Sequence, residues 1–264
     1  FAQELPRKTI LFLQLLGNTM PKTATKKAKI IAILNNKGGV GKTTTAVHVA
    51  YSLAKQGKKV LCVDMDGQAN FLLHIFPPKN VYELEAQQNS KPLPIMHHAS
   101  GVDVLPLSFW EASESKYVEV IRRYAADYDI TLIDCPPSLE TRTRAALDVA
   151  TSVLIPTEPE NLSYKGLVKL INLCAERDLP VLGIVITRFD KKKAAHNFYV
   201  QQLTTMYATF CLDAIVPNSA IFPSASGMNQ FGYEWQPKKN PALDAYTSIA
   251  KAVITFTEAK VEAE

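Results

Sequence analysis

The sequence predicts an α/β fold, a doubly wound and mostly parallel sheet with helices on both faces. Short apolar runs alternate along the chain with longer stretches of helical periodicity. The apolar runs are continuous rather than alternating, which is typical of strands buried on both faces. The repeated strand–helix order favours parallel strands joined by helical crossovers. The 264 residues are 47% hydrophobic and 20% charged, which is enough apolar material for a sizeable core.

Seven apolar runs are predicted strands, and they lie at 30–34, 60–63, 102–105, 130–133, 153–155, 181–186 and 214–216. The predicted helices are 43–56, 110–126, 164–176, 198–210 and 242–257. The first helix shows the pattern, because Ala46, Val49, Ala50 and Leu53 recur at helical spacing before Gly57, a common helix stop. Residues 77–100 are rich in proline and polar side chains, which predicts a loop with one short helix.

The first nineteen residues are interpreted separately from the rest. Arg7 and Lys8 precede the apolar run 10–16, but Gln14 interrupts the run and no small-residue cleavage pattern follows. The run is also too short to span a bilayer. We therefore expect residues 1–19 to be an upstream or non-native extension without a role in the fold. Residues 20–264, starting at Met20, are predicted to form a single domain.

Charge and cysteine content narrow the function classes only weakly. The net charge of +4 is mildly basic, which is compatible with weak binding to nucleic acid without indicating it. The four cysteines show no C-x-x-C pair or other metal-ligand spacing. We expect all of them to be reduced thiols of a cytosolic protein. They are Cys62, Cys135, Cys174 and Cys211.

The strongest motif is a glycine-rich turn, KGGVGKTT at residues 37–44, between the first predicted strand and the first predicted helix. Such a turn needs glycine because its backbone N–H groups must curl around phosphate oxygens. The helix N-terminus adds free N–H donors and a positive dipole end. Lys42 would contact the β- and γ-phosphates, and the Thr43 hydroxyl would bind Mg²⁺. The predicted nucleotide-binding residues here are Lys37, Gly38, Gly39, Val40, Gly41, Lys42, Thr43 and Thr44.

Carboxylates follow two of the predicted strands. Asp64 and Asp66 come after the second strand, and Asp134 ends the fourth. The carboxyl ends of parallel strands form the ligand crevice of such sheets, so these side chains should lie near the glycine-rich turn. The sequence therefore predicts a site for nucleotide phosphates and Mg²⁺.

The three motifs together resemble those of the ParA/MinD group of P-loop ATPases. The form K-G-G-x-G-K-[ST] is the deviant Walker A loop of that group. The stretch VDMDGQAN at 63–70 resembles its D-x-D-P-Q-G-N motif, and IDCPPS at 133–138 resembles its Walker B segment. The resemblance covers about residues 28–255, and the pattern is nearest to that of short, Soj-like ParA proteins.

The resemblance implies a P-loop NTPase fold and a role for individual residues. Lys37 would reach the nucleotide of a partner subunit, and Asp66 would orient the attacking water. The implied catalytic residues are Lys37, Lys42 and Asp66, and the implied metal residues are Thr43, Asp66 and Asp134. A looser similarity places the base near Arg188, Pro217 and Asn218.

Two departures from the family pattern bear on function. Gly67 replaces the usual proline, which is expected to loosen the segment after Asp66. Asn218 lies where the family pattern leads to an arginine associated with DNA binding. Other basic side chains remain as candidates, namely Arg188, Lys191, Lys192, Lys193, Lys238 and Lys239.

The resemblance implies a slow, Mg-dependent ATP hydrolase that works as a ParA-like switch in plasmid or chromosome partition or in cargo positioning. ATP would be sandwiched in a homodimer, a ParB-like protein would stimulate hydrolysis, and non-specific DNA would be the matrix. We expect a bacterial cytoplasmic, nucleoid-associated protein that does not bind membranes.

Three alternatives remain open. A MinD-like membrane-surface ATPase would need a basic amphipathic C-terminal helix, but residues 255–264 are acidic and poor in large apolar side chains. An electron-transfer ATPase like the nitrogenase iron protein would need cysteine ligands from two subunits. A small-molecule ligase or kinase, such as a relative of dethiobiotin synthetase, would share the P-loop.

Overall fold

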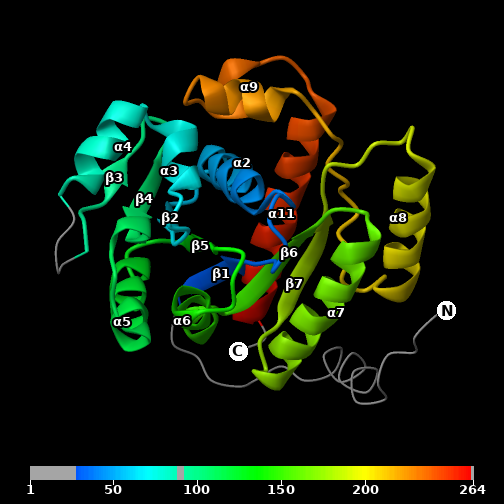
Figure 1. Cartoon of the computed structure of the whole chain (residues 1–264), viewed down its shortest axis with the longest axis horizontal. Coiled ribbons are helices and arrows are strands. Elements are labelled where there is room, and N and C mark those ends of the chain that lie inside the picture. The colour runs from blue at the N-terminus through cyan, green and yellow to red at the C-terminus, as the bar shows by residue number, and fades with distance from the viewer. Residues whose placement is uncertain (1–27, 88–91, 263–264) are drawn as a thin grey trace.

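The computed structural model describes residues 28–87 and 92–262, and within them the predicted fold class is confirmed (Figure 1). One sheet has the strand order β3-β4-β2-β5-β1-β6-β7. Its strands are β1 (Lys29–Ile33), β2 (Val60–Asp64), β3 (Met96–His97), β4 (Val102–Pro106), β5 (Ile130–Asp134), β6 (Ser152–Thr157) and β7 (Val181–Ile186). All neighbouring strands pair in parallel except β3, which is antiparallel to β4. The expectation for residues 1–19 lies outside the described residues.

Helices cover both faces of the sheet. The helices are α2 (Lys42–Lys55), α3 (Asn70–Ile75), α4 (Pro78–Glu85), α5 (Glu114–Ala125), α6 (Thr141–Val149), α7 (Asn161–Glu176), α8 (Ala194–Met206), α9 (Ile221–Gly227), α10 (Gly232–Trp235) and α11 (Pro241–Glu262). Figure 1 shows α2 and α11 on one face, with α5, α6 and α7 on the other. A short 3₁₀ turn, η1 (Leu107–Phe109), precedes α5.

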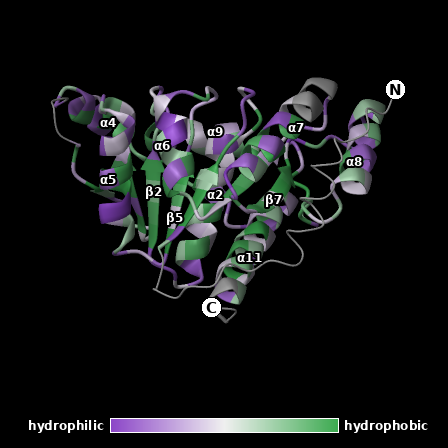
Figure 2. Cartoon of the chain, turned by 90° about the horizontal axis from the view of Figure 1, so that it is seen from below, coloured by the Kyte–Doolittle hydropathy of each residue, from purple (hydrophilic) through white to green (hydrophobic). Residues whose placement is uncertain are grey.

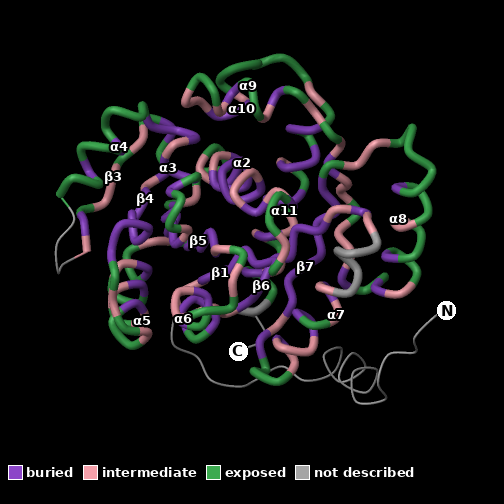
Figure 3. The backbone as a smooth tube through the Cα atoms, in the orientation of Figure 1, coloured by how far each residue is buried: buried purple, intermediate pink, exposed green. Residues whose placement is uncertain are grey.

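The central strand β1 shows why the apolar runs are continuous. Ile31 and Ile33 pack in the core under α2 and α11, whereas Ile30, Ala32 and Leu34 pack in the core under α5, α6 and α7. Successive side chains of a strand point to opposite faces, so a strand covered on both sides needs apolar residues at every position. Figure 2 shows the strands as the most hydrophobic part of the chain, and Figure 3 shows the same strands buried.

The strand order places a switch point at β1. The chain leaves β1 toward β2 and β4, returns to β5, and then crosses β1 to reach β6 and β7. In such sheets, ligands bind outside the carboxyl ends of the strands where the loops diverge. The glycine-rich turn follows β1 directly, so it lies at this edge of the sheet.

The prediction of a strand at 214–216 is wrong. This segment runs beside the end of β7, where the Val216 N–H donates to the Ile186 carbonyl at 2.8 Å. Its pairing consists of isolated bridges, Ile184 with Cys211 and Phe189 with Pro217, rather than a continuous ladder. The seventh strand is β3 instead, at the opposite edge and inside the stretch predicted as loop.

Other boundaries shift for local reasons. The helix predicted from residue 110 begins at Glu114, because Trp110 is extended (φ −112°, ψ 125°) and ends the 3₁₀ turn. Four short helices, α3, α6, α9 and α10, have no strong periodicity in the sequence and are not among the predicted elements. All four cysteines are free thiols, as expected. Within the described ranges, no helix has the length and apolar character needed to cross a membrane.

Candidate nucleotide site

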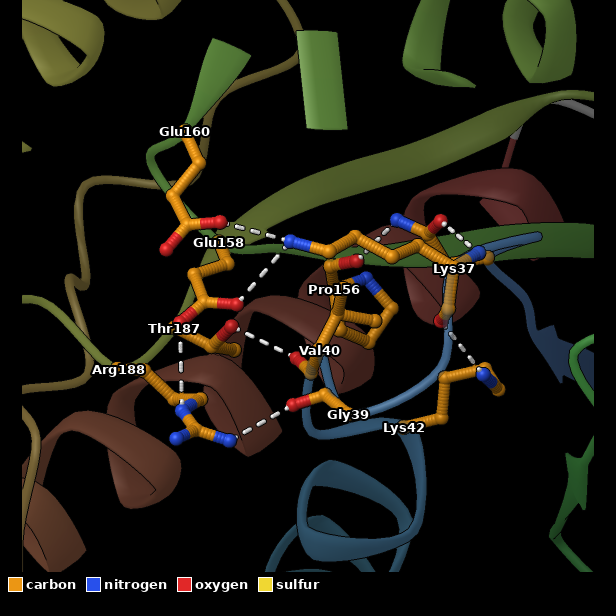
Figure 4. A network of polar contacts seen from close by, with 10 residues as sticks. Lys37, Gly39, Val40, Lys42, Pro156, Glu158, Glu160, Thr187 and Arg188 are labelled. Atoms are coloured by element: carbon orange, nitrogen blue, oxygen red, sulfur yellow. Dashed lines mark hydrogen bonds and ion pairs between the residues drawn. The ribbon is translucent and has the colours of Figure 1, made fainter. Parts of the chain in front are cut away.

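The glycine-rich turn is held in shape by two side chains, one that follows β1 and one that follows β7. Gly39 and Gly41 have φ values of +78° and +86°, a left-handed region that favours glycine. The buried Asn35 donates to the Pro156 carbonyl at 2.7 Å, and its side-chain oxygen accepts the Lys37 N–H at 2.9 Å. The Thr187 hydroxyl donates to the Val40 carbonyl at 2.8 Å (Figure 4). These hydrogen bonds fix the backbone of the glycine-rich turn.

Lys42 is the first residue of α2, and its side chain lies in this loop. The residue is 7% exposed, and its ammonium donates to the Lys37 carbonyl at 3.1 Å. Burial lowers the pKa of Lys42, and the charges of Asp134 and Asp66 act in the opposite direction. A buried cation beside a helix N-terminus attracts phosphate oxygens strongly. The structure thus places the Lys42 ammonium inside the glycine-rich turn, and its contact with phosphate stays a prediction.

Thr43 and Asp134 meet at the end of β5, as the sequence predicts. The Thr43 hydroxyl donates to one Asp134 carboxylate oxygen at 2.7 Å. The other oxygen of Asp134 is buried and has no hydrogen-bond partner among the described residues. Burial raises the pKa of Asp134 to about 7, against the effects of Thr43 and Lys42. An orphaned carboxylate oxygen beside a hydroxyl fits Mg²⁺, which takes one or two protein ligands and completes its shell with water and phosphate.

Asp64 and Asp66 have different environments. Asp64 is fully buried opposite Asp134 in the β2–β5 register, and its carboxylate accepts the backbone N–H groups of Asp66 and Leu72, each at 3.2 Å. Burial, followed by the charge of Asp134, raises its pKa well above the ordinary value. Asp66 is partly exposed, and its carboxylate accepts the Gln68 N–H at 3.1 Å. Asp64 therefore shapes the loop, whereas Asp66 is accessible to water and ligand.

Lys37 lies against two glutamates that follow β6. Its ammonium is 3.4 Å from Glu158 and 2.9 Å from Glu160 (Figure 4). Burial alone would lower the pKa of Lys37, but the hydrogen bonds and charges of Glu160 and Glu158 outweigh it and raise the pKa. The same contact lowers the pKa of Glu160. In this structure the side chain of Lys37 is thus directed toward its own chain.

Arg188 contacts the glycine-rich turn. Its guanidinium donates to the Gly39 carbonyl at 3.0 Å and lies 3.4 Å from Glu158. Pro217 and Asn218 lie beside the next residue, since Phe189 bridges to Pro217 and accepts the Asn218 N–H at 2.8 Å. The structure therefore brings the three residues predicted for the base together beside the glycine-rich turn, with the Arg188 side chain in contact with that turn.

Sequence reasoning missed Glu158 and Glu160. Both follow β6 at the same sheet edge as Lys37, but they are more than 120 positions away in the chain. The available signal was a Glu-x-Glu pair that begins three residues after the predicted strand 153–155. Nothing in that pair alone indicates that it faces a lysine.

The chain is similar to several known proteins. The family model described as an AAA domain matches residues 28–178. The chromosome partitioning protein ParA of Myxococcus xanthus is 33% identical over 216 residues, covering 72% of this chain and 76% of that protein. The chromosome-partitioning ATPase Soj of Thermus thermophilus is 30% identical over 243 residues, covering 86% of this chain and 96% of that protein.

Two solved structures share the fold. The cell division ATPase MinD of Pyrococcus furiosus superimposes with a TM-score of 0.72 at 24% identity, over 87% of this chain and 99% of that chain. The septum site-determining protein MinD of Pyrococcus horikoshii, complexed with Mg-ADP, gives a TM-score of 0.70 at 23% identity, over 88% and 98% of the two chains. At this level of identity the likeness concerns the architecture.

Proposed function

Because the chain belongs to the ParA/MinD group of P-loop ATPases within the AAA-domain family, we propose that it is a slow ATP hydrolase acting as a ParA-like partition switch. One observation carries the proposal. Two lysines, Lys37 and Lys42, flank a turn that contains two left-handed glycines and lies next to the Thr43–Asp134 pair. A simple phosphate-binding loop needs one lysine, so the second requires its own explanation.

Nucleotide binding follows from the loop. The N–H groups of residues 38–44 and the ammonium of Lys42 would surround the β- and γ-phosphates. Arg188, Pro217 and Asn218 would border the rest of the nucleotide. The Mg-ADP in the MinD of Pyrococcus horikoshii supports the choice of nucleotide and metal.

Hydrolysis would depend on the carboxylates at the strand ends. Thr43 and Asp134 would hold Mg²⁺, with Asp66 near its water shell, and the metal would offset the charge that develops on the phosphates. Asp66 is accessible enough to orient the attacking water. Lys42 would stabilise negative charge on the transferred phosphoryl group.

Dimerisation would make the chain a switch. Two ATP molecules facing each other bring many negative charges together, and a lysine from the opposite subunit would offset them. Lys37 is partly exposed at the rim of the loop, where it can exchange its own glutamates for a partner's phosphates. ATP would then shift the population toward the dimer, and hydrolysis would release it.

The cargo role is the finer part of the proposal. The names of the relatives, a chromosome partitioning protein and a chromosome-partitioning ATPase, support a matrix of nucleoid DNA in the bacterial cytoplasm. A ParB-like partner would stimulate hydrolysis and release the dimer from DNA. The exposed lysines of the loop 191–193 offer the simplest phosphate contacts.

The decisive experiment measures DNA binding with ATP, with ADP and without nucleotide. Wild type should bind non-specific duplex DNA only with ATP, and salt should weaken the binding strongly. Lys37→Ala should abolish the ATP dependence. Lys58→Ala is the matched control, because Lys58 forms an ion pair of 2.9 Å with Glu258 away from the site. Binding that ignores nucleotide, or a wild type that stays monomeric with a non-hydrolysable ATP analogue, would refute the switch.

A further inference from the structure

The side chain of Arg142 connects helix α6 to the loop that carries Asp66. It is 15% exposed and donates to the Met65 carbonyl at 3.3 Å and to the Ser108 carbonyl at 3.1 Å. Its other contacts are with the Trp110 carbonyl (3.4 Å), the Tyr117 hydroxyl (3.2 Å) and the Glu111 carboxylate (2.6 Å). A guanidinium has five N–H donors in a fixed plane, so one side chain can hold several carbonyls at once.

The contact with Met65 fixes one particular peptide group. The Met65 carbonyl and the Asp66 N–H belong to the same planar unit. Arg142 holds the carbonyl end, and the buried Asp64 carboxylate accepts the N–H end at 3.2 Å. The N–H of Met65 is held as well, by the Asp134 carbonyl at 3.1 Å. The backbone that leads into Asp66 is therefore restrained on both sides.

Gly67 leaves the space that this arrangement uses. A Cβ atom at position 67 would lie 3.2 Å from a terminal nitrogen of Arg142, closer than ordinary van der Waals contact. The family motif usually has proline at this position, and proline would stiffen the loop through its own ring. Here the absence of a side chain admits the guanidinium, and the stiffening comes from Arg142.

We propose that Arg142 is a positioning residue for Asp66. By fixing the Met65–Asp66 peptide plane it keeps the Asp66 carboxylate in the orientation that water activation needs. Asp134 is the last residue of β5, and α6 follows it in the chain. The contact between Arg142 of α6 and Met65 therefore also fixes the segment that carries Asp66 relative to the segment that carries Asp134. The inference rests on the proposed ATPase activity, since positioning has meaning only for a reaction.

A positioning role and a purely structural role differ in what they change. The three carbonyls near Arg142 are buried or nearly so, and losing their donor lowers stability in either case. Only the positioning role predicts that the folded protein turns over ATP more slowly while binding it equally well. A small displacement of a group that orients a reactant can cost about 10- to 100-fold in rate.

The test compares Arg142→Met and Arg142→Lys with wild type in steady-state ATPase assays below their melting temperatures. Arg142→Met should lower kcat by at least about tenfold, with KM for ATP and the affinity for a fluorescent ATP analogue changed less than about twofold. Arg142→Lys should recover part of kcat, since an ammonium can replace one bond of the fork but not all. Amide hydrogen exchange in residues 64–70 should become faster in the methionine variant.

Arg144→Met is the matched control. Arg144 lies two residues further along α6 and forms an exposed ion pair of 2.8 Å with Glu114, so its loss should leave kcat within about twofold. If Arg142→Met does not fold, Arg142→Lys and Gly67→Ala replace it, and both should lower kcat without raising KM. A wild type without ATP turnover would refute the proposed function itself. An active wild type whose Arg142 variants melt earlier but keep kcat would overturn the positioning role.

Discussion

Replacing Glu160 by glutamine should strengthen the proposed ATP-dependent dimer. The Lys37 ammonium is 2.9 Å from Glu160 and 3.4 Å from Glu158 within its own chain. To reach the phosphates of a partner, Lys37 has to leave these carboxylates. Glu160→Gln removes the charge of the nearer carboxylate and preserves the shape of the side chain. In the free subunit, Lys37 is therefore held less strongly by its own chain.

The magnitude follows from the exposure of the pair. The two side chains are 29% and 44% exposed, which places their attraction in the range of partly solvated ion pairs, about 0.5 kcal/mol. A dimer releases two such pairs, so the total is about 1 kcal/mol if the sites are independent. The dimer dissociation constant should therefore fall about fivefold.

Sedimentation or light scattering with a non-hydrolysable ATP analogue measures the effect. Glu258→Gln controls for the change in net charge, because Glu258 forms an ion pair of the same length, 2.9 Å, with Lys58. In a Lys37→Met background the substitution of Glu160 should have no effect. A weaker dimer in Glu160→Gln, or the same gain in both backgrounds, would refute the reasoning.

Three further outcomes are expected. Lys42→Met should abolish ATP binding in a fluorescence titration with little loss of stability, because it removes a buried charge whose pKa burial already lowers. Gly41→Ala should lower the free energy of unfolding by about 1–2 kcal/mol in urea titrations, since the φ of Gly41 is +86°. Gly38→Ala is the control, because no atom lies within 4 Å of the new Cβ. It should change the free energy of unfolding by less than about 0.5 kcal/mol. Burial lowers the pKa of His74 in the folded protein to about 4. Below about pH 6.5 the unfolded state therefore binds more protons than the folded state, and the free energy of unfolding decreases as the pH is lowered. His74→Phe should remove about 2 kcal/mol of that loss between pH 7 and 5, and an unchanged difference in unfolding free energy between the two pH values would contradict the assignment.

The parts of the fold that sequence predicted well have strong local signals. The strand 181–186 and the helix after the glycine-rich turn follow from apolar runs and helical spacing that lie within one segment. The strand at 214–216 was wrong because its pairing depends on the geometry at the edge beside β7. The two-residue strand β3 forms only because β4 lies alongside it. A strand of two or three residues at the edge of a sheet is too short to show a recognisable sequence pattern.

The sequence by itself determined the make-up of the glycine-rich turn. The glycines at 39 and 41, the lysine at 42 and the threonine at 43 belong to one continuous turn, so their spacing was sufficient to predict it. Only the tertiary structure decided which groups control that loop from outside. Glu160 faces Lys37 across 123 positions, and Arg142 reaches Met65 across 77. Such contacts are set by the order of strands in the sheet and the packing of helices on it, which no local pattern records.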